Sequence, residues 1–152
     1  RTKNGRLGGR DMPGGVELYR RVRAKFRRHC VQGNVKEYSA ARMEDQTRRH
    51  TKFGNNIYLQ EPDVKRGCGG LRDYQNLLWI TYFKEGALTT THLVGKDWLN
   101  LGDRHRIDPA YAFLLRVRTQ LHYTTEHATS VLHPSLQTDI GETTRQPPNS
   151  RR

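Results

Sequence analysis

The residues of this sequence that are best suited to chemistry lie in one segment, residues 58–73. Its two carboxylates, Glu61 and Asp63, are two positions apart, so in an extended chain their side chains point the same way. A carboxylate pair on one side of the chain can hold Mg²⁺, which prefers oxygen ligands and commonly accompanies phosphates. Glu61 and Asp63 are therefore candidate ligands of a metal ion.

Glycines and cations follow these carboxylates. Gly69 and Gly70 stand directly before a predicted helix, where a glycine pair lets the backbone approach a ligand and aims free N–H groups at it. Lys65, Arg66 and Arg72 add positive charge beside the same helix start. The pattern predicts a phosphate-binding site made of these five residues.

A purely structural interpretation fits the same segment. In it the glycines only turn the chain, Asp73 favours the helix N-terminus through the helix dipole, and Glu61 pairs with Lys65 or Arg72. The rest of the sequence offers no stronger chemistry, because its seven histidines form no H-E-x-x-H motif and it has no P-loop or nucleophile elbow. The segment is thus the main candidate site.

Helices must position this segment, because apolar residues recur at helical spacing along most of the chain. Four principal helices and one short one are predicted, over residues 16–32, 35–53, 71–84, 96–101 and 109–129. Asp108 is the expected N-cap of the last helix, with Pro109 in its first position. Residues 57–60 predict one short extended segment. The expected fold is mainly α, a helical bundle-like domain.

Domain boundaries follow from composition. Residues 1–15 are rich in glycine and are expected to form a loop or frayed start. Residues 16–136 are expected to form the helical domain, and the polar residues 137–152 a disordered tail. The chain begins with Arg1 rather than Met, so we expect it to be an excerpt from a longer protein.

Composition argues against several classes of protein. Only 34% of the residues are hydrophobic, and no apolar run approaches the roughly 20 residues of a membrane helix, so no membrane span is expected. Cys30 and Cys68 are too few for a disulfide framework or a complete cysteine zinc site. Without a secretory signal at its start, the chain is expected to be cytoplasmic.

The net charge of +12 comes mainly from the first third of the chain. Basic clusters at residues 20–23, 25–28 and 48–49 supply it. Such a surface attracts phosphates, so the alternative function is a basic helical module that binds nucleic acid. A solvated helix face is the simpler explanation, since no base-stacking aromatic pattern, zinc finger, RNA-recognition signature or GXXG loop accompanies the clusters.

Two runs in the candidate segment also carry a resemblance to a known family. They are Glu61-Pro62-Asp63-Val64-Lys65 and Gly69-Gly70-Leu71-Arg72-Asp73. Together they resemble the E-P-[ND]-[hydrophobic]-K-x-x-x-G-G-L-R-D stretch of the bacterial PII uridylyltransferase/uridylyl-removing enzymes. Flanking residues, including Arg49-His50 and Phe113 to Arg118, extend the resemblance over residues 16–137. Cys68 stands where the family often has proline.

The resemblance implies partners and a cofactor. Members of the family transfer UMP from UTP to the PII nitrogen-signalling protein and remove it again, using a D-x-D nucleotidyltransferase core and an HD-type hydrolase domain. This sequence contains neither a D-x-D pair nor a His-Asp dipeptide, so it resembles the helical region after the core and is expected to be inactive alone. The implied partners are UTP, PII and the nucleotidyltransferase core of the parent chain, and the implied cofactor is Mg²⁺.

The resemblance also implies roles for the candidate residues. Lys65, Arg66 and Arg72 would neutralise the triphosphate or support the loop, with the backbone of Gly69 and Gly70 near phosphate. The rival role is structural, in which the motif docks the helical domain on the catalytic core.

Overall fold

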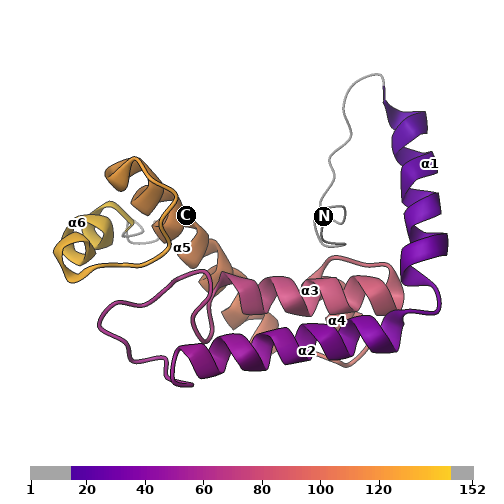
Figure 1. Cartoon of the computed structure of the whole chain (residues 1–152), viewed down its shortest axis with the longest axis horizontal. Helices are drawn as coiled ribbons and strands as arrows, with labels where there is room; N and C mark the ends of the chain where they lie inside the picture. Colours follow the sequence, from indigo (N-terminus) through magenta and orange to yellow (C-terminus); the bar gives the residue numbers. More distant parts are fainter. Residues whose placement is uncertain (1–14, 145–152) are drawn as a thin grey trace, which may run out of the picture.

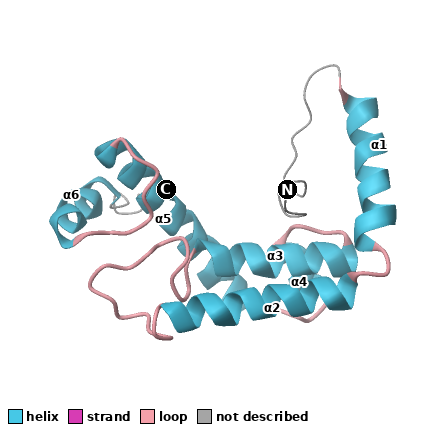
Figure 2. Cartoon of the chain, viewed as in Figure 1, coloured by secondary structure: helices cyan, strands magenta, loops and turns pink. Residues whose placement is uncertain are grey.

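A computed structural model describes residues 15–144, and in this range the chain is built of helices joined by loops, with no β-strand (Figures 1 and 2). The helices are α1 Val16–Phe26, the π-helical turn η2 Arg27–Val31, α2 Val35–Lys52, α3 Leu71–Glu85, α4 Thr90–Gly95, α5 Leu101–Thr125 and α6 Pro134–Thr144. The predicted mainly α fold is confirmed. No helix in the described part is long and apolar enough to cross a membrane.

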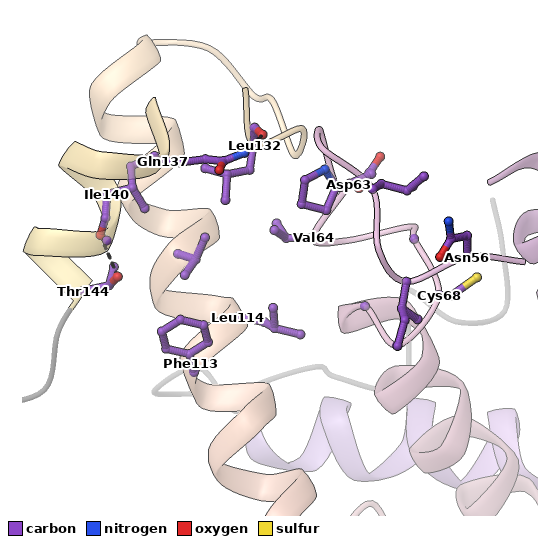
Figure 3. A pocket seen from close by; sticks show the side chains of 18 residues that line it. Asn56, Asp63, Val64, Cys68, Phe113, Leu114, Leu132, Gln137, Ile140 and Thr144 are labelled. Carbon is purple, nitrogen blue, oxygen red and sulfur yellow. Dashed lines mark hydrogen bonds between the residues drawn. The ribbon is translucent and has the colours of Figure 1, made fainter. Parts of the chain in front are cut away.

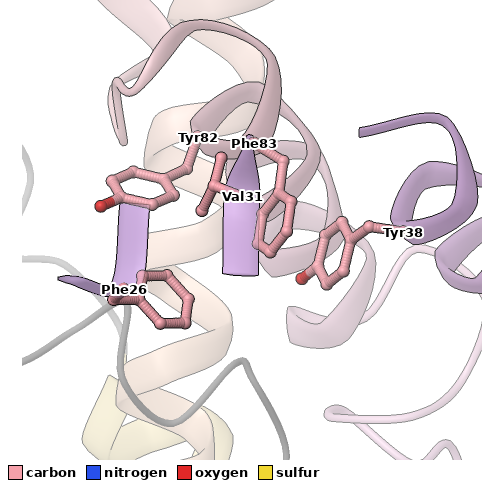
Figure 4. Close-up of a cluster of buried hydrophobic side chains, with 5 residues drawn as sticks. All are labelled: Phe26, Val31, Tyr38, Tyr82 and Phe83. Atoms are coloured by element: carbon pink, nitrogen blue, oxygen red, sulfur yellow. The ribbon is translucent and has the colours of Figure 1, made fainter. Parts of the chain in front are cut away.

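The helices α2 and α3 run antiparallel, side by side, at the centre of the molecule (Figure 1). A cluster of buried side chains holds them to the end of α1: Phe26, Val31, Tyr38, Tyr82 and Phe83 (Figure 4). The rings of Tyr38 and Phe83 stack with their centroids 3.5 Å apart, which joins α2 directly to α3. The rest of α1 stands away from this pair, and Phe26 is its only buried residue.

A second cluster lies where α5 meets α6 and the loop between α2 and α3. Its buried members are Val64, Val117, Leu121 and Ile140. Leu121 is fully buried, so this cluster has a true interior although it contains few residues. It fixes the candidate segment against α5 and α6, whereas the first cluster fixes α3, the helix that the segment begins.

The loop between α2 and α3 is held at its middle by the segment that precedes α6. The N–H of Val64 donates to the carbonyl of Ser130 at 2.8 Å, and that of Leu132 donates to the carbonyl of Pro62 at 3.0 Å. Asp63 and Val131 form an isolated antiparallel bridge between these bonds. Residues 57–60, where extended chain was predicted, carry no ladder pairing, because the partner segment lies beside residues 62–64 instead.

The helix α5 begins earlier than the sequence predicts. Asn100 is its N-cap, and the Asn100 side chain accepts a hydrogen bond from the N–H of Asp103 at 2.7 Å. Pro109 therefore lies inside the helix, and Asp108 is not the cap. Asp108 was a plausible cap locally, but its carboxylate is occupied by Tyr74 and Thr90, which come from other helices.

Two further boundaries differ from the sequence prediction. The short helix expected over 96–101 is replaced by α4, Thr90–Gly95, where the Thr89 side chain accepts from the N–H of His92. The tail expected from residue 137 is helical as far as Thr144, because Ile140 of α6 packs into the second cluster. The frayed start over 1–14 and the tail over 145–152 lie outside the described residues.

Candidate functional site

The glycine-rich loop, residues 63–70, closes on itself at the start of α3. The N–H of Leu71 donates to the carbonyl of Val64 at 3.0 Å, and the N–H of Arg72 donates to the carbonyl of Lys65 at 2.9 Å. These two N–H groups belong to the first turn of α3 and would otherwise lack partners. The loop therefore caps the helix with its own backbone.

The two glycines serve this closure. The N–H of Gly69 donates to Asp73 Oδ2 at 2.9 Å, and the N–H of Gly70 donates to the carbonyl of Gly67 at 3.0 Å. Gly69 has φ of 72°, and a Cβ on Gly70 would lie 2.9 Å from the carbonyl oxygen of Gly67. The expectation that these amides point freely at a ligand is wrong, and phosphate contact by Gly69 and Gly70 stays a prediction.

Asp73 is the residue that joins the loop to α2. Its carboxylate accepts hydrogen bonds from Arg49 Nη2 at 2.9 Å, from His50 Nε2 at 2.8 Å and from the N–H of Gly69. Arg49 also donates through Nη1 to the carbonyl of Arg66 at 3.2 Å. Asp73 thus does more than favour the helix dipole, because it anchors the loop to the last turns of α2.

The two carboxylates proposed as metal ligands face different partners. Oδ1 of Asp63 accepts from the backbone N–H groups of Lys65 and Arg66 at 2.9 and 2.8 Å, which makes Asp63 the cap of the loop. Glu61 Oε1 lies 3.0 Å from Nδ1 of His133, so Glu61 does not pair with Lys65 or with Arg72.

This geometry does not fit a magnesium site built from Glu61 and Asp63 together. Between residues 15 and 144, no group of three or more His, Cys, Asp or Glu side chains is placed to hold a metal ion. Asp63 is buried, and half of its carboxylate is committed to the loop backbone. A Mg²⁺ requirement stays a prediction for the parent enzyme.

The cations of the loop lie near one another, and their role as a phosphate site stays a prediction. Burial lowers the pKa of the Lys65 ammonium, and the like charges of Arg118, Arg72 and Arg66 lower it further. Arg118 comes from α5 and reaches the loop beside Ser130, whose hydroxyl accepts from Arg118 Nε at 3.3 Å. Arg118 was not predicted as a site residue, because only packing of α5 brings it to residues 65–72.

Arg72 is held more firmly than a surface arginine. Its guanidinium lies over the ring of Trp79, 5.2 Å from the centroid, a cation–π arrangement between residues about two helical turns apart on α3. Burial lowers the pKa of Arg72, and the nearby Arg49 lowers it further. Trp79 therefore lies where its fluorescence can report on ligands that reach Arg72.

An apolar hollow of about 300 Å³ lies between the loop and helices α5 and α6 (Figure 3). Val64, Val117 and Ile140 of the second cluster line it, together with Phe113 on the α5 side. Cys68 lines the loop side of the hollow and is a free thiol. The hollow suits an apolar group rather than a phosphate, because Lys65, Arg66, Arg72 and Arg118 do not line it.

Comparison with known proteins gives consistent matches. A family model described as GlnD PII-uridylyltransferase matches residues 37–150. The chain is 36% identical over 135 residues to the bifunctional uridylyltransferase/uridylyl-removing enzyme of Azospirillum brasilense, and the match covers 89% of this chain but 14% of that protein. It is 35% identical over 132 residues to the enzyme of the same name from Erythrobacter litoralis (strain HTCC2594), covering 87% and 14%.

No solved structure matches the chain. The chain spans about 14% of the length of these curated relatives, so their names describe proteins that are much longer. The matches nevertheless cover most of the present sequence, including the whole glycine-rich loop. The chain belongs to the GlnD PII-uridylyltransferase family.

Proposed function

We propose that this chain supplies the helical part of an enzyme that transfers UMP from UTP to a PII-type protein. In this proposal Lys65, Arg66 and Arg72 neutralise the triphosphate of UTP. Membership of the family and the names of the relatives support the reaction class. The catalytic core, the bound Mg²⁺, the PII partner and a cytoplasmic location belong to the proposal, as does inactivity of the chain alone.

The observation that carries the proposal is the concentration of positive charge at the loop. Lys65, Arg66, Arg72 and Arg118 lie close enough for their like charges to lower the pKa of Lys65. The two aspartates of the loop region are already engaged, Asp63 with the loop backbone and Asp73 with α2. Like charges held together in this way repel one another, and an anionic ligand relieves that repulsion.

The loop contributes rigidity as well as charge. Transfer of a nucleotidyl group depends mainly on positioning and on charge stabilisation by groups that are already in place. The backbone of residues 63–73 is pinned by its own hydrogen bonds and by Asp73. The backbone that carries the cations therefore does not need to change conformation when a phosphate binds.

A second role, docking, is favoured by a separate observation. Ile57 and Phe113 border the apolar hollow, yet they are 61% and 45% exposed. Exposed apolar groups around a hollow are typical of a surface that another protein element covers. In this role the loop region holds the helical part against the catalytic core of the same parent chain. The comparisons do not favour the alternative of a nucleic-acid-binding module.

The test is Arg72→Ala in the parent enzyme. Losing one charge-assisted phosphate contact should raise KM for UTP by about tenfold or more. Arg106→Ala is the matched control, since Arg106 is an exposed arginine of α5 that belongs to neither cluster. An unchanged KM and kcat in Arg72→Ala would refute the phosphate role and leave docking as the function of the motif.

A further inference from the structure

A second basic feature lies at the opposite end of α3 from the glycine-rich loop. A surface hollow of about 180 Å³ is found there, between the end of α1, the turn η2 and the C-terminus of α3. Its lining residues include three cations, Arg23, Arg27 and Lys84. Arg23 and Arg27 come from the basic part of the sequence that the proposed uridylyltransferase role leaves unexplained.

The three cations lack acidic partners within residues 15–144. No Asp or Glu of that range forms an ion pair with Arg23, Arg27 or Lys84. Eight other cationic side chains in the range, five of them Lys or Arg and three His, do form such pairs. Glu85, the adjacent acid, is engaged by Lys96 at 3.2 Å. The hollow therefore carries a local positive charge that the described chain does not compensate.

The backbone around the hollow is specialised. Arg27 and Val31 are the first and last residues of the π-helical turn, and the N–H of Gln32 donates to the carbonyl of Arg27 at 3.0 Å. All three residues line the hollow. Turns of π-helix are rare and occur frequently at functional sites. Burial of Val31 in the first cluster locks this turn in place, which fixes the start of the Arg27 side chain.

The Arg27 guanidinium lies beside Gly86, the C-cap of α3, which has φ of 77°. A Cβ built on Gly86 would make only an ordinary van der Waals contact with it, 3.7 Å from Arg27 Nη2. A guanidinium here is favoured by the negative end of the α3 dipole, which explains one cation at this place. The dipole does not explain why Arg23, one helical turn before Arg27, also lines this hollow.

We propose that Arg23 and Arg27, with Lys84 nearby, form a binding site for a phosphate group. Two guanidiniums on one side of a small hollow can each give paired N–H donors to one oxyanion. The Lys84 ammonium lies 5.1 Å from the centroid of the Trp98 ring and adds charge to the rim. The phosphate comes either from the inorganic ion or from a nucleotide, and the hollow holds only the phosphate group.

The experiment is a titration of the intact protein with inorganic phosphate at constant ionic strength, with chloride as the balancing anion, followed by calorimetry. Arg72→Ala serves as the background, so that phosphate bound at the glycine-rich loop does not contribute. Arg27→Gln and Arg23→Gln should each weaken phosphate binding by about tenfold or more. Arg28→Gln is the matched control, because Arg28 is an exposed arginine of the same turn that does not line the hollow; its affinity should stay unchanged.

Further arms separate the outcomes. Arg27→Lys keeps the charge without the paired donors and should bind phosphate with an affinity between those of wild type and Arg27→Gln, provided that circular dichroism shows all variants folded. Equal affinity for UMP and inorganic phosphate identifies the free ion as a sufficient ligand, and tighter UMP binding that Arg27→Gln abolishes identifies a nucleotide. The proposal would be overturned if phosphate showed no saturable binding above the chloride control, or if Arg27→Gln and Arg28→Gln lost phosphate affinity equally. Neither result would bear on the proposed contact between Arg72 and UTP.

Discussion

Single side chains decide how the glycine-rich loop is held. Asp73 receives hydrogen bonds from Arg49, His50 and the backbone of Gly69, so one carboxylate connects α2, the loop and α3. Asp63, at the start of the loop, plays a similar role, because its carboxylate accepts hydrogen bonds from the N–H groups of residues 65 and 66. Both aspartates of the motif therefore shape the loop, and the cations are the groups left to meet a ligand.

Asp73→Asn should lower the free energy of unfolding by about 1.5–3 kcal/mol, the range for hydrogen bonds that involve charged groups. An amide cannot accept from both Arg49 and His50 with the strength of a carboxylate. Asp139→Asn is the control, since Asp139 is exposed on α6 and should change stability by less than about 0.5 kcal/mol. Urea unfolding measures both, and equal effects would contradict the anchoring role of Asp73.

Tyr74 makes stability sensitive to alkaline pH. Burial, helped by the hydrogen bond that its hydroxyl donates to Asp108, raises the pKa of Tyr74 from 10.0 to about 12. Between these values the unfolded chain has lost a proton that the folded chain keeps, so the free energy of unfolding should fall as pH rises from about 10 to 12.

Tyr74→Phe tests this dependence by urea unfolding at a series of alkaline pH values. The decline between pH 10 and 12 should be shallower in Tyr74→Phe than in wild type, because the perturbed phenol is absent. Tyr58→Phe is the control, since Tyr58 is 86% exposed and should leave the slope as it is. Identical slopes in all three proteins would show that Tyr74 does not titrate with a raised pKa.

At the scale of elements, the start of α5 shows how a tertiary contact moves a helix boundary. Asp108 and Pro109 form a strong local start signal, yet the helix begins at Leu101. Asp108 accepts from Tyr74 of α3 at 3.0 Å and from Thr90 of α4 at 2.8 Å, so it binds three helices together from within α5. These bonds offset the hydrogen bond that Pro109 removes from the helix interior.

Asn100→Ala should destabilise the protein by about 1 kcal/mol, the usual cost of losing an N-cap side chain. The reason is that Asn100 Oδ1 accepts from the N–H of Asp103. Asn100→Ser keeps a capping oxygen and should remain close to wild type. Thermal melts compare the three proteins, and full stability of Asn100→Ala would contradict a helix start at Leu101.

At the scale of the whole molecule, two small hydrophobic clusters replace one large core. The first joins α1, α2 and α3, and the second joins the loop, α5 and α6 (Figures 3 and 4). Several large apolar side chains outside them are exposed, among them Leu18 at 68% and Ile57 at 61%. A chain with this surface is expected to gain stability from contact with the rest of a longer parent protein.

A thermal melt of the isolated chain, followed by tryptophan fluorescence, tests this expectation and the nucleotide contact together. Trp79 packs against the first cluster and lies under Arg72, so it reports on both. We expect a cooperative melt that Mg-UTP shifts upward, because a ligand that binds the native state stabilises it. A cooperative melt without a shift would favour docking. A melt without cooperativity would mean that the chain needs its parent core to fold.

Much of the candidate site could be predicted from sequence because it is local. The start of α3 at Leu71, its end at Gly86 and the clustering of Lys65, Arg66 and Arg72 all depend on residues within a few positions of one another. The mainly α fold follows from the same short-range spacing. The order of residues in the motif was also sufficient to indicate the family that the comparisons then showed.

The destinations of the hydrogen bonds were decided only by tertiary structure. Asp73 meets Arg49, and Arg118 joins the cations beside Lys65, across long stretches of chain that no local pattern connects. The contact between Glu61 and His133 also joins distant parts of the chain. The sequence of α6 is mostly polar, and its helix is held because Ile140 packs into the second cluster. Spacing in a sequence reports which residues share a face of one element, whereas pairing between elements depends on how those faces pack.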